Sequence, residues 1–165
     1  MIRSAAGIAV VGAMLGGAAC RQSDGPMPVP VDEQPNRVED IGRDLKNVAS
    51  GQPEAEAELL SDLLTLDRDE PPLPLAQEVV RELASALRGR ELGDAGSQQL
   101  ARALFVVSAG RDLSRRQIGR VGEGVTEVLL EAGADEAAAQ RVSAAVVALA
   151  ASVTRNQKRW YHVGT

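Results

Sequence analysis

The sequence predicts an all-α protein, a bundle of five or six helices that follows an N-terminal signal peptide and a proline-rich linker. Three observations support this fold class. The 165-residue chain has one Phe, one Trp and one Tyr, whereas β-strands are enriched in aromatic residues. Alanine and leucine, which are strong helix formers, are abundant. Apolar residues also recur at helical spacing from residue 36 onward.

The first two predicted helices are separated by Gly51, which supplies a stop. Asn36 is the expected N-cap of the first, with Glu39 completing a pair that resembles a capping box. Its apolar stripe is Val38, Ile41, Leu45 and Val48. The second helix is expected to begin near Pro53, a residue suited to a first turn. Its buried face is Leu59, Leu60, Leu63 and Leu64.

The third and fourth predicted helices follow a break at residues 71–74, where three of four residues are proline. The third is expected to end at Gly89, and the fourth to run from Ser97 to just before Gly110. The inward residues of the third are Leu75, Val79, Val80, Leu83 and Leu87. Those of the fourth are Leu100, Leu104, Phe105 and Val107.

The fifth and sixth predicted helices have the clearest starts. Ser114 and Gln117 form a capping box for the fifth, which stops at Gly133, and Asp135 caps the sixth. The fifth buries Ile118, Val121, Val125, Val128 and Leu129. The sixth carries Val142, Val146, Leu149 and Val153. Because the residues of the sixth helix are apolar or small on almost every side, we expect this helix at the centre of the bundle. Its apolar stretch, residues 142–153, is too short to span a membrane.

The fifth helix contains three glycines, Gly119, Gly122 and Gly124, each of which costs about 1 kcal/mol relative to alanine. One interpretation is tight packing against small residues of the sixth helix, which are Ala144, Ala145, Ala148 and Ala151. The alternatives are a local break in the helix or a site where a ligand approaches the backbone.

The N-terminus has the plan of a secretory signal, with Arg3 ahead of an apolar core and small residues from Gly16 to Ala19. Cys20, the only cysteine, follows directly. Gly17-Ala18-Ala19-Cys20 resembles the lipobox of bacterial lipoprotein precursors. This resemblance implies cleavage before Cys20 and acylation of its sulfur. Without acylation, the protein would be secreted or, less in keeping with its short apolar stretch, held by a retained helix.

These features divide the chain into a signal peptide at residues 1–19, a lipidated cysteine and flexible tether at 20–35, and a helical domain at 36–165. Prolines favour an extended tether, which reaches roughly 45 Å over 15 residues. Arg21 follows the cysteine, and the resemblance to Gram-negative lipoproteins then implies an outer-membrane location facing the periplasm.

Few residues are suited to catalysis or to binding a cofactor or metal, and we expect neither. The only histidine is His162, so a Ser-His-Asp triad would have to use the tail. The Glu-x-x-His pairs of di-iron bundles are absent from the sequence. The carboxylate pairs Glu78–Glu82 and Glu127–Glu131 suit a solvated surface better than acid-base work. Residues 67–70 hold three carboxylates but lack the rest of a calcium loop.

A basic and aromatic C-terminus is the best candidate contact patch. Trp, Tyr and Arg dominate the energetics of interfaces. The patch consists of Arg159, Trp160, Tyr161 and His162, preceded by Arg155 and Lys158. Alternatively, Trp160 folds back and closes the end of the bundle.

The sequence as a whole predicts a membrane-anchored envelope lipoprotein with a non-enzymatic binding or scaffolding role. The expected partners are the membrane, through the anchor on Cys20, and an envelope protein. The net charge of −5 argues against nucleic acid. A helical carrier of an apolar small molecule is the alternative, and a carboxylate-based enzyme ranks last.

Overall fold

The computed structural model describes residues 33–66, 71–110 and 112–161, and the side chains of 37–66, 71–110 and 112–155. Within these residues there are six helices and no strand, which confirms the predicted all-α fold. The helices are α1 (Glu33–Ala49), α2 (Ala55–Thr65), α3 (Leu73–Leu87), α4 (Asp94–Ser108), α5 (Arg115–Glu131) and α6 (Glu136–Tyr161).

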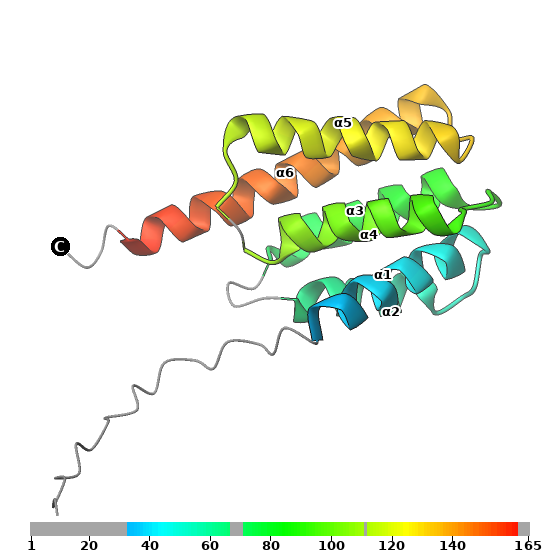
Figure 1. Ribbon diagram of the computed structural model, residues 1–165, viewed down its shortest axis with the longest axis horizontal. Coiled ribbons are helices and arrows are strands. Elements are labelled where there is room, and N and C mark those ends of the chain that lie inside the picture. Colours follow the sequence, from blue (N-terminus) through cyan, green and yellow to red (C-terminus); the bar gives the residue numbers. More distant parts are fainter. Residues whose placement is uncertain (1–32, 67–70, 111, 162–165) are drawn as a thin grey trace, which may run out of the picture.

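The six helices run back and forth along a common direction (Figure 1). The middle of the bundle is formed by α3, which packs against α2 and α6, and α4, which packs against α1 and α5. The pairs α1–α2 and α5–α6 lie on opposite sides of this middle layer. Because successive helices alternate in direction, α1 and α5 begin at the same end of the bundle, and α6 ends there.

One hydrophobic core joins all six helices. Each helix contributes a leucine whose exposure is 1% or less: Leu45, Leu63, Leu87, Leu104, Leu129 and Leu149. Burial of such side chains is the main favourable contribution to folding. The apolar stripes expected from helical spacing supply most of this core. The expected residues that are only partly buried are Val38, Leu60, Leu64, Leu75, Phe105 and Val121.

Helix ends follow the predictions where a cap or a glycine marks them. The capping box of α5 is present: the Gln117 backbone N–H donates to Ser114 Oγ at 3.3 Å, and the Ser114 N–H donates to Gln117 Oε1 at 2.8 Å. At α6, the Ala138 N–H donates to Asp135 Oδ1 at 2.9 Å. The four expected stop glycines have left-handed φ angles between 58° and 83°, which residues with a Cβ rarely adopt.

The predicted starts of α1 and α4 are too late, by four and three residues respectively. Helix α1 begins at Glu33, so Asn36 lies inside its first turn and is not the N-cap. Pro35 is compatible with this earlier start because a first-turn N–H has no partner within the helix. Helix α4 begins at Asp94 after an N-cap at Gly93. Ser97 is inside this helix, and its hydroxyl donates to the Asp94 carbonyl at 2.9 Å.

The expectation that the sixth helix lies at the centre of the bundle is wrong. Ala137, Ala144 and Ala148 form an exposed stripe along α6, and the opposite side packs against α3, α4 and α5. The alanines of α6 made every side of the helix appear apolar in the sequence, although alanine is also tolerated at a protein surface. Residues Glu136–Arg155 are long and apolar enough to cross a membrane by length and composition, although half of that window is buried within the bundle.

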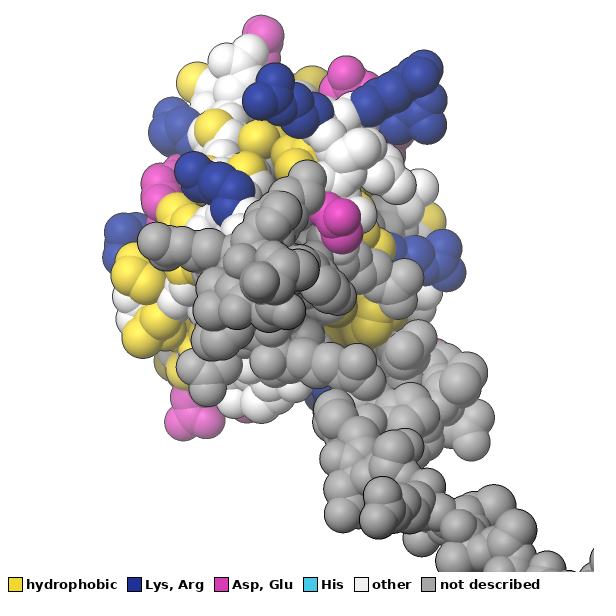
Figure 2. Space-filling view, turned by 90° about the vertical axis from the view of Figure 1, so that its left-hand side faces the viewer, with side chains coloured by type: hydrophobic (Ala, Val, Ile, Leu, Met, Phe, Trp, Pro, Cys, Tyr) yellow, Lys and Arg dark blue, Asp and Glu magenta, His cyan; other side chains and the backbone are white. Residues whose placement is uncertain are grey.

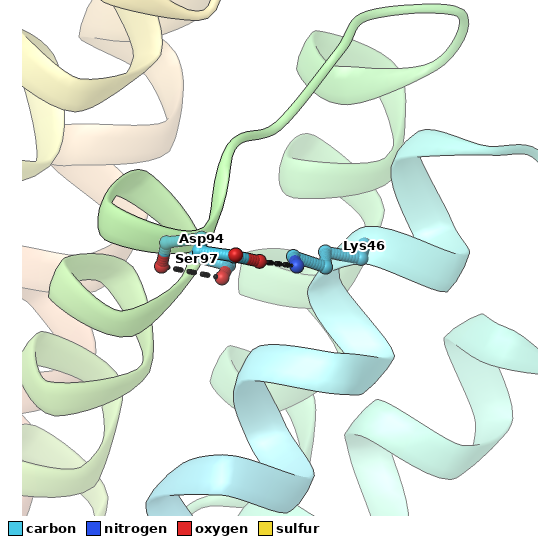
Figure 3. A network of polar contacts seen from close by, with 3 residues as sticks. All are labelled: Lys46, Asp94 and Ser97. Atoms are coloured by element: carbon cyan, nitrogen blue, oxygen red, sulfur yellow. Dashed lines mark hydrogen bonds and ion pairs between the residues drawn. The ribbon is translucent and has the colours of Figure 1, made fainter.

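A polar clamp joins the C-terminal end of α1 to the start of α4 (Figure 3). Lys46 in the last turn of α1 pairs with the exposed carboxylate of Asp94 in the first turn of α4. Both charges suit the dipole of their own helix. The hydrogen bond and charge of Lys46 lower the pKa of Asp94. We interpret the clamp as structural.

Candidate functional site

The predicted contact residues lie at or beyond the end of α6. Arg159, Trp160 and Tyr161 occupy its last helical turns, where the structure describes the backbone and not the side chains. Cys20 and His162 lie outside the described residues. We use the name α5–α6 end for the end of the bundle at which α5 begins and α6 ends. It is formed by residues 113–118 and 151–155.

The three glycines of α5 have different surroundings. A Cβ at Gly122 would lie 2.8 Å from Val147 Cγ2 and 2.9 Å from Ser143 Oγ, both on α6. Gly122 is therefore the position of close helix approach. Gly119 and Gly124 are exposed, and a Cβ at either would meet no heavy atom within 4 Å. The close approach uses Ser143 and Val147, whereas two of the expected alanines, Ala144 and Ala148, face outward.

The backbone of Gly122 also holds the two helices together through its carbonyl. The Ser143 hydroxyl donates to this oxygen at 2.8 Å, across the helix interface. The Thr126 hydroxyl, one turn further along α5, donates to the same oxygen at 3.0 Å. Gly122 therefore takes part in helix packing through both its missing Cβ and its carbonyl oxygen.

A pocket of about 430 Å³ lies instead at the α5–α6 end. This volume is within the range typical of ligand sites. The pocket is largely apolar and opens to solvent. It is lined by Leu113, Ser114, Arg115, Ile118, Ala151, Thr154 and Arg155.

Basic side chains surround the apolar part of this pocket. Arg115 and Arg155 line it from α5 and α6, and Arg116 lies next to Arg115, exposed, in the first turn of α5. No ion pair joins these three arginines to a carboxylate in the described part of the chain. The view onto this end shows Lys and Arg side chains around hydrophobic ones in its upper half (Figure 2). The pocket therefore suits a ligand that combines an anion with an apolar part.

A second unusual feature is a buried carboxyl group between α1 and α2, which was not anticipated from the sequence. Asp44 on α1 has a side chain only 3% exposed. Asp62 and Glu58 of α2 lie near enough to interact with it electrostatically. Among the described residues, Arg43 forms an ion pair with Asp44, with Arg43 Nε 3.9 Å from Asp44 Oδ1.

These surroundings favour the neutral form of Asp44. Burial, and then the negative charges of Asp62 and Glu58, raise the pKa of Asp44 from 3.8 to about 6, against a smaller lowering by Arg43. A protonated Asp44 avoids both a buried charge and repulsion by its acidic neighbours. The sequence did hold a signal for this group, because Asp44 falls on the same helical stripe as Ile41 and Val48.

The carboxylate pairs expected from the sequence lie at or near the surface of the described part of the chain. Glu78, Glu127 and Glu131 are exposed, and Glu82 accepts from Arg141 Nε at 3.2 Å. No group of three His, Cys, Asp or Glu side chains suited to a metal occurs among the described residues. The acidic segment at residues 67–70 lies outside them.

The site with the most specific chemistry is therefore the arginine-lined pocket at the α5–α6 end. Comparison of the chain with protein-family models, with curated proteins and with solved structures finds no match.

Proposed function

We propose that the protein is a lipid-anchored component of a bacterial cell envelope, whose helical domain binds or scaffolds another component without catalysing a reaction. The lipobox-like residues Gly17 to Cys20 support the anchor. The arginine-lined pocket supports a binding role, because it presents an apolar surface beside cations that have no carboxylate partner in the described residues. The buried Asp44 does not favour catalysis, since it does not line this pocket.

The anchor is tested by replacing the proposed acylation site. In cells that process lipoproteins, the chain should incorporate labelled fatty acid and fractionate with membranes, and the outer membrane is the expected fraction. Cys20→Ala should abolish incorporation and release the protein. A variant that carries no label and still remains membrane-bound after a high-salt wash would show a retained helix instead.

The binding role is tested by crosslinking in the intact envelope, followed by identification of what is captured. Trp160→Ala should weaken capture and leave the thermal midpoint nearly unchanged, because aromatic side chains contribute strongly to interfaces. A large loss of stability with Trp160→Ala would instead assign this residue to closing the bundle.

A second candidate function is a carrier of an apolar small molecule, which the pocket volume of about 430 Å³ favours. This function predicts that an apolar compound remains bound to the purified protein. Mass spectrometry of an organic extract of the purified protein distinguishes it from the scaffolding role.

A further inference from the structure

We propose that the α5–α6 end docks onto an anionic phospholipid surface, with Arg115 and Arg155 at the level of the headgroups and the apolar pocket toward the acyl chains. This inference deepens the proposed function by naming the partner of the pocket, and it rests on that function for the presence of a nearby membrane. Three independent features of the described residues support it.

The first feature is the position of the pocket relative to the tether. Helix α1 begins at the same end of the bundle as α5, which is also where α6 ends (Figure 1). A lipid anchor that precedes α1 therefore connects to the domain at the end that carries the pocket. The turns of α6 after Arg155 continue at this end with Lys158, Arg159 and Trp160.

The second feature is the chemistry of the pocket. Its lining includes Leu113, Ile118 and Ala151, and the guanidinium groups come from Arg115 and Arg155. Guanidinium groups match the geometry of phosphate oxygens and form paired hydrogen bonds with them. A phospholipid surface places anionic phosphates beside an apolar layer of acyl chains. The pocket likewise places cationic arginines beside an apolar lining, so the two surfaces are complementary in charge and polarity.

The third feature is a charge distribution that does not serve the fold. Helix α5 begins with Arg115 and Arg116 and ends with Glu131, which opposes the preference of the helix dipole at both ends. At the far end of the bundle, the exposed carboxylates of Glu54, Glu56, Asp135 and Glu136 outnumber the exposed arginines Arg88 and Arg90. An anionic surface would therefore attract the α5–α6 end and repel the opposite one.

The test measures vesicle binding by the full chain carrying Cys20→Ala, so that no acyl chain contributes. Two kinds of vesicle are compared: phosphatidylcholine alone, and equal parts of phosphatidylglycerol and phosphatidylcholine. Binding is followed by flotation and by the emission of Trp160, which is the only tryptophan in the chain and lies in the last turns of α6. We expect stronger binding and a larger blue shift with the anionic vesicles, and loss of the difference at high salt.

Matched charge variants locate the contact. Each basic residue near an anionic surface contributes on the order of 1 kcal/mol, so Arg115→Gln with Arg155→Gln should weaken anionic binding about thirtyfold. Arg88→Gln with Arg90→Gln removes the same charge from exposed residues at the far end and should change binding little. The N-terminal apolar segment is present in every variant and contributes equally to all of them.

Three results would overturn the inference: equal binding to both kinds of vesicle, anionic binding that survives loss of Arg115 and Arg155, or an equal loss in the far-end control. Circular dichroism of each variant verifies that it is folded. Because Cys20 is absent from this experiment, its failure leaves the proposed anchor intact. Failure of fatty-acid incorporation would in turn leave the vesicle result unchanged.

Discussion

At the scale of single residues, Asp44 opposes the stability of the fold at neutral pH. Its pKa is about 6 in the folded protein and 3.8 in the reference state. Between these values the folded state binds more protons than the unfolded state, so the contribution of Asp44 to stability falls as pH rises. That contribution is fully present below about pH 4 and is lost above about pH 6.

Asp44→Asn should therefore stabilise the protein at neutral pH. The shift corresponds to about 3 kcal/mol of unfolding free energy at pH 7, and the advantage over the unsubstituted chain should disappear near pH 4. Urea unfolding of both proteins between pH 4 and pH 8 measures this difference. Glu39→Gln, on the exposed side of the same helix, is the control. A variant that is less stable at pH 7 would show that ionised Asp44 is well accommodated.

Ser108 is a second residue whose polar group works against the fold. It is fully buried at the end of α4, and its hydroxyl has no hydrogen-bond partner among the described residues. Burial of an unsatisfied hydroxyl costs about 1–3 kcal/mol. Ser108→Ala should thus raise the unfolding free energy by about 1 kcal/mol, as measured by chemical denaturation. A clear loss of stability would mean that the hydroxyl is hydrogen-bonded.

At the scale of elements, the α5–α6 pair depends on one close approach. Gly122→Ala would place a Cβ 2.8 Å from Val147 Cγ2, so the helices must separate or Val147 must move. Overpacking of this kind typically costs about 1–3 kcal/mol, which should outweigh the better helix propensity of alanine. Thermal unfolding should show a lower midpoint.

Gly119→Ala is the matched control in the same helix. Its Cβ would lie in open space, so only helix propensity changes, and we expect stabilisation of up to about 1 kcal/mol. The two variants should shift the midpoint in opposite directions. Stabilisation by both would show that the interface at Gly122 has room for a methyl group.

Helix ends were predictable from sequence only where a local interaction determines them. The Ser114–Gln117 capping box and the left-handed stop glycines are local, so their positions were correct. Asn36 and Ser97 have the residue types of N-caps, but α1 and α4 continue through both. At α4, the earlier start also allows Asp94 to pair with Lys46 on α1, a contact that local sequence does not reveal.

At the scale of the whole molecule, helical spacing identified the core stripes but not the arrangement of the helices. Alanine-rich α6 lies on one side of the bundle, and α3 and α4 form its middle. The pocket was not predictable, because it joins residues 113–118 to residues 151–155, and their proximity depends on the antiparallel packing of α5 and α6. The closeness of Asp62 to the buried Asp44 likewise depends on how α1 packs against α2.

In the proposed arrangement, the tethered bundle presents its α5–α6 end to the membrane. Orientation is measured with a fluorophore on one introduced cysteine, in the acylated protein reconstituted into vesicles that carry a lipid-borne quencher. Arg116→Cys labels the α5–α6 end, and Gln52→Cys labels the exposed connection at the opposite end. A helix of 17 residues separates such positions by about 25 Å. We expect strong quenching at position 116 and weak quenching at position 52. Equal quenching at both, or stronger quenching at position 52, would contradict it.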